Sequence, residues 1–139
     1  MERGRANGPG TGMLTIEQIK AHCRLELDET DEDAQLMIYG RAAWRAVETT
    51  TRRKLFSVTL PEDAPPEAGA DEEYLRALLP STAPENALPV TDDIRLAMLM
   101  LVAHWDRNRE AVTDSTATGS KALPLAFDAL VGPYHWFSL

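Results

Sequence analysis

The sequence contains few cysteines, few aromatic residues and no long apolar run. Cys23 is the single cysteine among 139 residues, so the chain can form no internal disulfide and no metal site with several cysteine ligands. This cysteine usage is typical of a reducing compartment. No apolar run reaches the roughly 20 residues that a membrane-spanning helix needs, so we expect no membrane partner.

Basic residues are also scarce. The chain has 14 Lys and Arg against 22 Asp and Glu, which gives a net charge of -8. A helical DNA-binding module would need clustered Lys and Arg to neutralise phosphates, so the charge disfavours that class of protein. With 44% hydrophobic and 26% charged residues, the composition is that of one globular domain with a modest core.

The residue patterns that catalysis and cofactor binding require are missing. His22, His104 and His135 lie far apart in the sequence without further ligands at suitable spacing. Gly119-Ser-Lys121 lacks the order of a phosphate-binding loop, and no Gly-x-Ser-x-Gly motif is present. The acidic run at 26–33 lacks the glycine and the distal glutamate of a calcium loop. We therefore expect no enzymatic activity, no metal and no cofactor.

Helix signals dominate what the sequence does contain. The clearest is the segment 88–112, in which Thr91 or Asp92 can cap the first amides and Asp92 and Asp93 suit the positive end of the helix dipole. Its apolar residues recur at helical spacing and predict one buried stripe: Ile94, Ala97, Met98, Leu101, Val102 and Trp105.

Three further helices are predicted. Thr15 and Gln18 have the spacing of a capping box, which predicts a short helix over 16–23. A long helix is expected from about 31 to 51, with Gly40 indicating close packing or a bend. Its expected buried side consists of Leu36, Ile38, Ala42, Ala43, Ala46, Val47 and Thr50. Pro124 suits the first turn of a helix over 123–131, which Gly132 and Pro133 would end.

The middle of the chain is irregular. Residues 55–60 alternate like a strand, which cannot form a sheet alone and could pair with a neighbouring copy. Residues 61–89 contain six prolines around a short helical stretch at 71–79. The predicted fold is all-α: a small bundle of about four helices, two long and two short, with a proline-rich central excursion and one short β-strand or hairpin.

The expected domain organisation is a disordered leader over residues 1–12, or an upstream start with Met13 as the true beginning, followed by a single helical domain over 13–139. Residues 56–88 form an irregular insertion in it. The acidic run at 26–33 is interpreted first as a solvated loop whose last carboxylates cap the next helix. The aromatic C-terminal residues are costly to expose, so they pack either on the domain itself or in a partner.

The order of these segments resembles that of the small head-tail connector (adaptor) proteins of long-tailed bacteriophages. The resemblance rests on 13–25, the acidic spacer, the helix ending at 48–55, the segment 89–111 with its His-Trp-x-x-Asn-Arg-Glu end, and Leu123-Pro followed by a terminal aromatic segment. It implies a helical subunit of the virion, made in the host cytoplasm, that forms a dodecameric ring beneath the portal protein. Such a ring would extend the DNA channel without binding DNA specifically and would join the capsid to a neck or tail-completion protein.

A closed ring of identical subunits needs two different complementary faces on each copy. The acidic run and the basic residues Arg52, Arg53, Lys54, Arg107 and Arg109 are candidates for these faces. Trp105 and Arg109 have residue types enriched at interface hot spots, although an internal clasp, with Trp105 in the core and Arg109 on a carboxylate such as Glu48, is equally compatible. The candidate subunit or portal interface comprises Asp28, Glu29, Asp31, Glu32, Arg52, Arg53, Trp105, Arg107, Arg109, Tyr134, Trp136 and Phe137.

A second class of function is also compatible with the sequence. A small helical regulatory or adaptor protein of a bacterial cell could bind one protein partner as a monomer or dimer. It would differ from a connector in its oligomeric state and in its gene neighbourhood.

Overall fold

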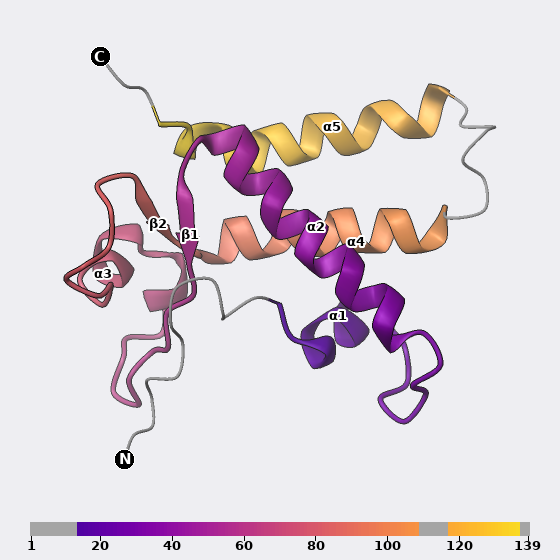
Figure 1. Ribbon diagram of the computed structural model, residues 1–139, viewed down its shortest axis with the longest axis horizontal. Helices are drawn as coiled ribbons and strands as arrows, with labels where there is room; N and C mark the ends of the chain where they lie inside the picture. The colour runs from indigo at the N-terminus through magenta and orange to yellow at the C-terminus, as the bar shows by residue number, and fades with distance from the viewer. Residues whose placement is uncertain (1–13, 109–116, 137–139) are drawn as a thin grey trace.

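The computed structural model describes residues 14–108 and 117–136, except for the side chains of 117–122. Within them lie five α-helices: α1 (Ile16–Cys23), α2 (Asp33–Thr51), α3 (Glu72–Arg76), α4 (Asp92–Arg107) and α5 (Ala117–Val131). Helices α4 and α5 lie side by side, while α2 crosses α4 and α1 packs beneath both α2 and α4 (Figure 1). The predicted helical fold class is thereby confirmed, and α3 lies within the short helical stretch predicted at 71–79.

Local capping signals set the starts of α1 and α4 as expected. The Thr15 hydroxyl accepts from the Gln18 amide at 3.1 Å, and the Gln18 side chain accepts from the Thr15 amide at 3.0 Å, which completes the capping box. At α4, the Thr91 hydroxyl accepts from the Ile94 amide at 3.3 Å. The second helix begins later than expected, at Asp33, and the side chain of Glu32 makes no capping hydrogen bond.

Helix α5 is longer than predicted. It begins at Ala117, so Pro124 lies inside the helix and not in its first turn. A proline there removes one backbone hydrogen bond and crowds the preceding turn. The helix nevertheless continues upstream of Pro124, and a short 3-10 turn at Gly132–Tyr134 follows its end.

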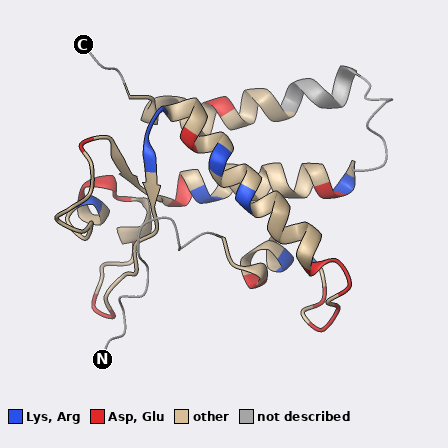
Figure 2. Cartoon of the chain, viewed as in Figure 1, with Lys and Arg blue, Asp and Glu red and all other residues tan. Residues whose placement is uncertain are grey.

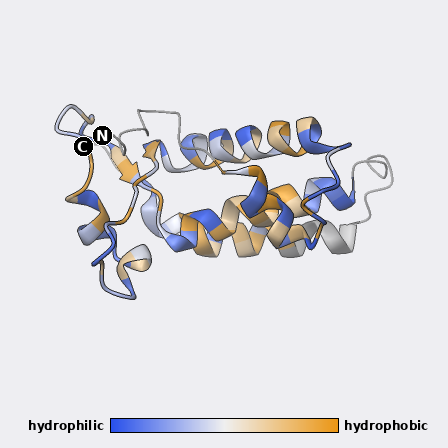
Figure 3. Ribbon diagram, turned by 90° about the horizontal axis from the view of Figure 1, so that it is seen from below, coloured by the Kyte–Doolittle hydropathy of each residue, from blue (hydrophilic) through white to orange (hydrophobic). Residues whose placement is uncertain are grey.

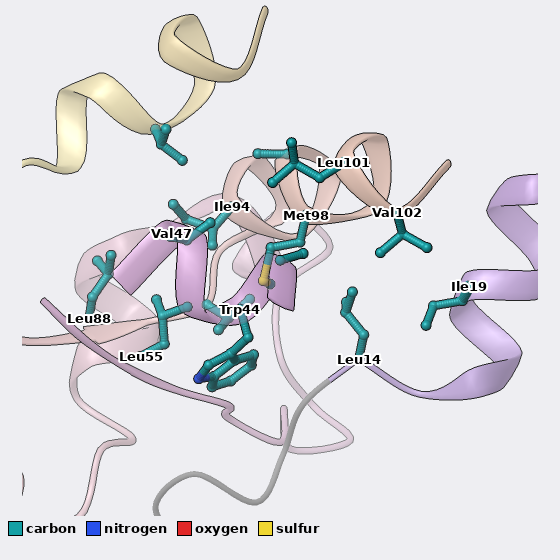
Figure 4. Close-up of a cluster of buried hydrophobic side chains, with 14 of the residues drawn as sticks. Leu14, Ile19, Trp44, Val47, Leu55, Leu88, Ile94, Met98, Leu101 and Val102 are labelled. Carbon is teal, nitrogen blue, oxygen red and sulfur yellow. The ribbon is translucent and has the colours of Figure 1, made fainter. Parts of the chain in front are cut away.

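The core lies between α2, α4 and the first turn of α1, and it includes Leu55 and Leu88 of the sheet and Val131 at the end of α5. Hydrophobic and hydrophilic residues are mixed along the helices, as in amphipathic helices (Figure 3). The predicted stripe of α4 is buried, with Trp105 only half-buried. On α2 the buried side is rotated from the predicted one, because Ile38 is 50% exposed and Trp44 only 4% exposed. Figure 4 shows Trp44 beside Met98 in the buried cluster. The α2 stripe that packs inward is Leu36, Gly40, Ala43, Trp44, Val47 and Thr51.

Gly40 lies where α1 packs tightly against α2. A Cβ atom at this position would lie 3.2 Å from Cδ1 of Ile19. Ile19 itself is completely buried. The expectation that Gly40 allows close packing is therefore confirmed.

A two-stranded parallel sheet closes one end of the bundle. Strand β1 (Lys54–Phe56) pairs with β2 (Ala87–Pro89), with Leu55 opposite Leu88. Parallel strands require a crossover connection, which here contains the 3-10 turn Ala68–Ala70 and α3. The strand predicted at 55–60 is thus shorter, its partner is in the same chain, and the pair is not a hairpin.

Among the residues that the structure describes, two other than glycine have left-handed backbone conformations. Arg24 and Arg52, at the ends of α1 and α2, both have φ of 62°. Side chains disfavour this conformation, whereas glycine adopts it freely. Changing Arg24 to glycine should therefore raise the free energy of unfolding by about 0.5 to 1 kcal/mol, measured by urea denaturation. Arg24→Ala keeps the Cβ atom and should give no gain; an equal gain in both variants would show that backbone strain is not the cause.

Candidate subunit interface

The acidic loop, residues 26–32, is held in shape by a buried lysine. Lys20 on α1 is only 2% exposed. Its ammonium group donates to the backbone carbonyls of Leu27 at 3.1 Å and Glu29 at 2.6 Å, and it lies 2.8 Å from the Asp33 carboxylate. The loop side chains point into solvent, including Leu27, which is 63% exposed. The loop is therefore a structured projection that presents carboxylates around one apolar side chain.

A basic depression of about 280 Å3 lies at the other end of α2, beside the start of β1. Four cations line it, Arg45, Arg52, Arg53 and Lys54, together with the carboxylate of Glu48. Thr49 and Asn86 complete the lining. The carboxylate of Glu48 accepts from the Leu55 amide at 3.0 Å and lies 4.0 Å from the Lys54 ammonium. Figure 2 shows the acidic loop and this basic segment at opposite ends of α2.

Arg53 differs from its basic neighbours because its side chain points inward and is only 10% exposed. It donates to the carbonyls of Ala87 at 3.2 Å, Tyr134 at 3.3 Å and Asn86 at 3.5 Å. Its guanidinium also lies 5.3 Å from the ring centroid of Trp136. Burial and then the neighbouring Arg76 lower the pKa of Arg53, while Glu72 opposes this effect. Arg53 therefore joins α2, the sheet and the C-terminal segment.

The C-terminal segment Tyr134–Trp136 packs on its own domain. The Trp136 amide donates to the carbonyl of Thr51 at 2.8 Å. The Tyr134 hydroxyl accepts from Thr91 at 3.3 Å and donates to Asp93 at 3.1 Å, at the start of α4. We call this set of contacts, together with those of Arg53, the C-terminal clasp.

The Tyr134 hydroxyl makes stability depend on pH. Burial, and then the nearby Asp93, raise its pKa above the ordinary value of 10.0, with the Thr91 hydrogen bond opposing the shift. Because the folded state holds this proton more tightly, its contribution is fully present below pH 10 and is lost as the pH rises through the folded-state pKa. Tyr134→Phe should lower the free energy of unfolding by about 1 kcal/mol at pH 8. The difference between the two proteins should shrink above pH 10 in denaturation curves; a constant difference would contradict this role for the hydroxyl.

A groove of about 330 Å3 lies between α1, α4 and α5, and Arg107 and His22 contribute to its lining. Nearby, burial and then Asp106 raise the pKa of the Cys23 thiol, while Arg107 opposes the shift. Arg107 thus lies beside α1 and away from the basic depression.

Trp105 on α4 packs against Tyr39 on α2. Their ring centroids are 6.0 Å apart and the ring planes are tilted by 51°.

The structure places the predicted interface residues at several separate sites. The predicted acidic residues lie on the acidic loop, and Arg52 is exposed in the basic depression, whereas Arg53, Tyr134 and Trp136 form the clasp. Trp105 packs on Tyr39, and Arg109 and Phe137 lie outside the described residues. Sequence reasoning missed Lys20 and Arg45. A lone lysine shortly before an acidic run was the available signal for Lys20.

Within the described ranges, no helix is long and apolar enough to cross a bilayer. Over the same residues, no group of three or more His, Cys, Asp or Glu side chains is arranged to hold a metal ion. The features that stand out are therefore surfaces and internal contacts.

Comparison with known proteins identifies the family. A family model described as phage gp6-like head-tail connector protein matches residues 13–134. A chain in the solved structure "Neck of empty GTA particle computed with C6 symmetry" shares the fold, with a TM-score of 0.54 and 21% identity over 91% of each chain. No curated protein matches. Because the family model spans most of the sequence, the protein belongs to the phage gp6-like head-tail connector family and is a structural component of the head–tail junction of the virion.

Proposed function

We propose that the protein assembles as a closed ring, a dodecamer, beneath the portal protein, and that this ring joins the capsid to a neck or tail-completion protein. The observation that carries this proposal is the family match over residues 13–134. The fold shared with a chain from a neck solved with C6 symmetry supports it further, because a ring of twelve copies is compatible with six-fold symmetry.

The proposed ring extends the DNA channel without binding DNA specifically. A net charge of -8 supports this role, because a protein that bound the duplex tightly would draw on clustered cations to release counterions. The charged surfaces at the two ends of α2 also support ring assembly, since head-to-tail contacts need two different faces.

The test is the molar mass of the purified protein, measured by light scattering across a concentration series with and without the portal protein. We expect a ring-sized species, either alone or only with portal, because assembly can require the portal as a template. A protein that remains monomeric in the presence of portal would contradict the proposal. A salt-dependent shift of duplex DNA would contradict the passive role toward DNA.

A further inference from the structure

We propose that the acidic loop of one subunit binds in the basic depression of the next subunit around the ring. This inference rests on the proposed ring and names the two surfaces that form its repeating contact. The occupant of the depression is thus a second copy of this chain.

The backbone of the acidic loop is ordered within the single subunit, before any partner binds. Lys20 fixes the carbonyls of Leu27 and Glu29, and it is paired with Asp33. The remaining loop carboxylates point into solvent, on a backbone that the lysine already orders. A loop ordered in advance loses less conformational entropy on binding, so more of its interaction energy appears as affinity.

The cations of the basic depression outnumber its one carboxylate, Glu48. Arg53 is turned inward to the clasp, and the Glu48 carboxylate already binds the Leu55 amide and lies near Lys54. Arg45 and Arg52 are exposed, as is Lys54, whose side chain is 55% exposed. These three cations are opposite in charge to the acidic loop, on a protein that is otherwise strongly acidic, and such complementarity fixes which surfaces meet.

The positions of the two surfaces exclude pairing within one subunit. They lie at opposite ends of α2, whose 19 residues span about 28 Å at 1.5 Å per residue. A loop and a depression separated in this way can pair only between copies. The resulting contact is head-to-tail, which is the type that closes into a ring when the rotation is suitable.

Two charge-reversed variants test this contact in the presence of portal protein. The first, Asp28→Lys with Glu29→Lys, reverses the loop, and the second, Arg45→Glu with Arg52→Glu, reverses the depression. Each variant alone should assemble at least about tenfold more weakly than the wild type, because like charges would face each other at every contact. Circular dichroism of each variant confirms that it folds.

Mixing the two variants gives the decisive result. The reversed loop of the first variant is complementary to the reversed depression of the second, and their unchanged surfaces are complementary as well. An equimolar mixture should therefore recover ring assembly with alternating subunits, which native mass spectrometry identifies by their masses. Two controls reverse exposed charges elsewhere, Glu62→Lys with Asp63→Lys and Arg41→Glu, and should assemble as the wild type does.

Failure of this inference differs from failure of the proposed ring. If the wild type forms no ring with portal, the proposed function is wrong. If the wild type forms a ring but the reversed variants also do so, or if their mixture does not recover, the loop does not occupy the depression. Loss of portal binding by the depression variant, with subunit contacts unchanged, would assign the depression to portal and overturn the inference.

Discussion

Replacing Lys20 with methionine should lower the free energy of unfolding by about 2 to 4 kcal/mol. The methionine side chain fills the space of the lysine stem but donates no hydrogen bond. The carbonyls of Leu27 and Glu29 would lose their donor, and Asp33 would lose its cation. Since Asp33 is 34% exposed, water can solvate it in part, which places the loss below that of a fully buried ion pair.

Lys54→Met is the matched control for this substitution. Its ammonium group is exposed and lies 4.0 Å from a single carboxylate, that of Glu48. An exposed ion pair contributes little, so the control should change stability by at most about 0.5 kcal/mol. Urea denaturation of both variants at a concentration that keeps the chain monomeric gives the comparison.

Hydrogen exchange shows whether the loss is local to the acidic loop. In Lys20→Met, amides within residues 26–33 should exchange faster, because the backbone of the loop is no longer fixed by the ammonium group. Equal destabilisation by the two methionine variants, or unchanged exchange in the loop, would show that Lys20 does not order it.

The parts of the fold that the sequence predicted depend on contacts between near neighbours. The capping box of Thr15 and Gln18 and the Thr91 cap involve residues three positions apart, so residue type and spacing were sufficient. The apolar stripe of α4 was equally clear. On α2 the apolar residues are spread around the helix, so the choice between Ile38 and Trp44 depended on where α4 lies.

The parts that the sequence did not predict depend on distant segments. β1 meets β2 only after a crossover of about thirty residues, in which the sequence indicated prolines and one short helical stretch but no pairing between the two strands. The partners of Arg53 lie 33, 34 and 81 positions away. No local pattern indicates such pairings, because they arise from the packing of whole helices.

The basic sequence Arg52-Arg53-Lys54 shows how adjacent residues take different roles. The left-handed conformation of Arg52 ends α2 and redirects the chain into β1. Arg53 then points inward, while Arg52 and Lys54 stay exposed. A cluster that looked like one surface in the sequence is therefore divided between an internal clasp and a binding depression.

Replacing Arg53 with methionine should lower the free energy of unfolding by about 2 to 3 kcal/mol. The carbonyl of Tyr134 would lose its guanidinium donor, whereas that of Ala87 would keep the one from Arg76 at 3.1 Å. The contact with the ring of Trp136 would also be lost. Arg53→Lys keeps the charge but not the planar set of donors, so it should recover less than half of the loss.

Arg52, the exposed neighbour of Arg53, provides the control for this substitution. Arg52→Met should change stability by at most about 0.5 kcal/mol, because Arg52 is exposed. In Arg53→Met the Trp136 amide should exchange faster, since the clasp that seats it on Thr51 is weakened. If Arg53→Met loses stability while still binding portal as the wild type does, the segment acts as part of the domain core. Unchanged stability with lost portal binding would instead make Arg53 and the residues it holds a docking surface.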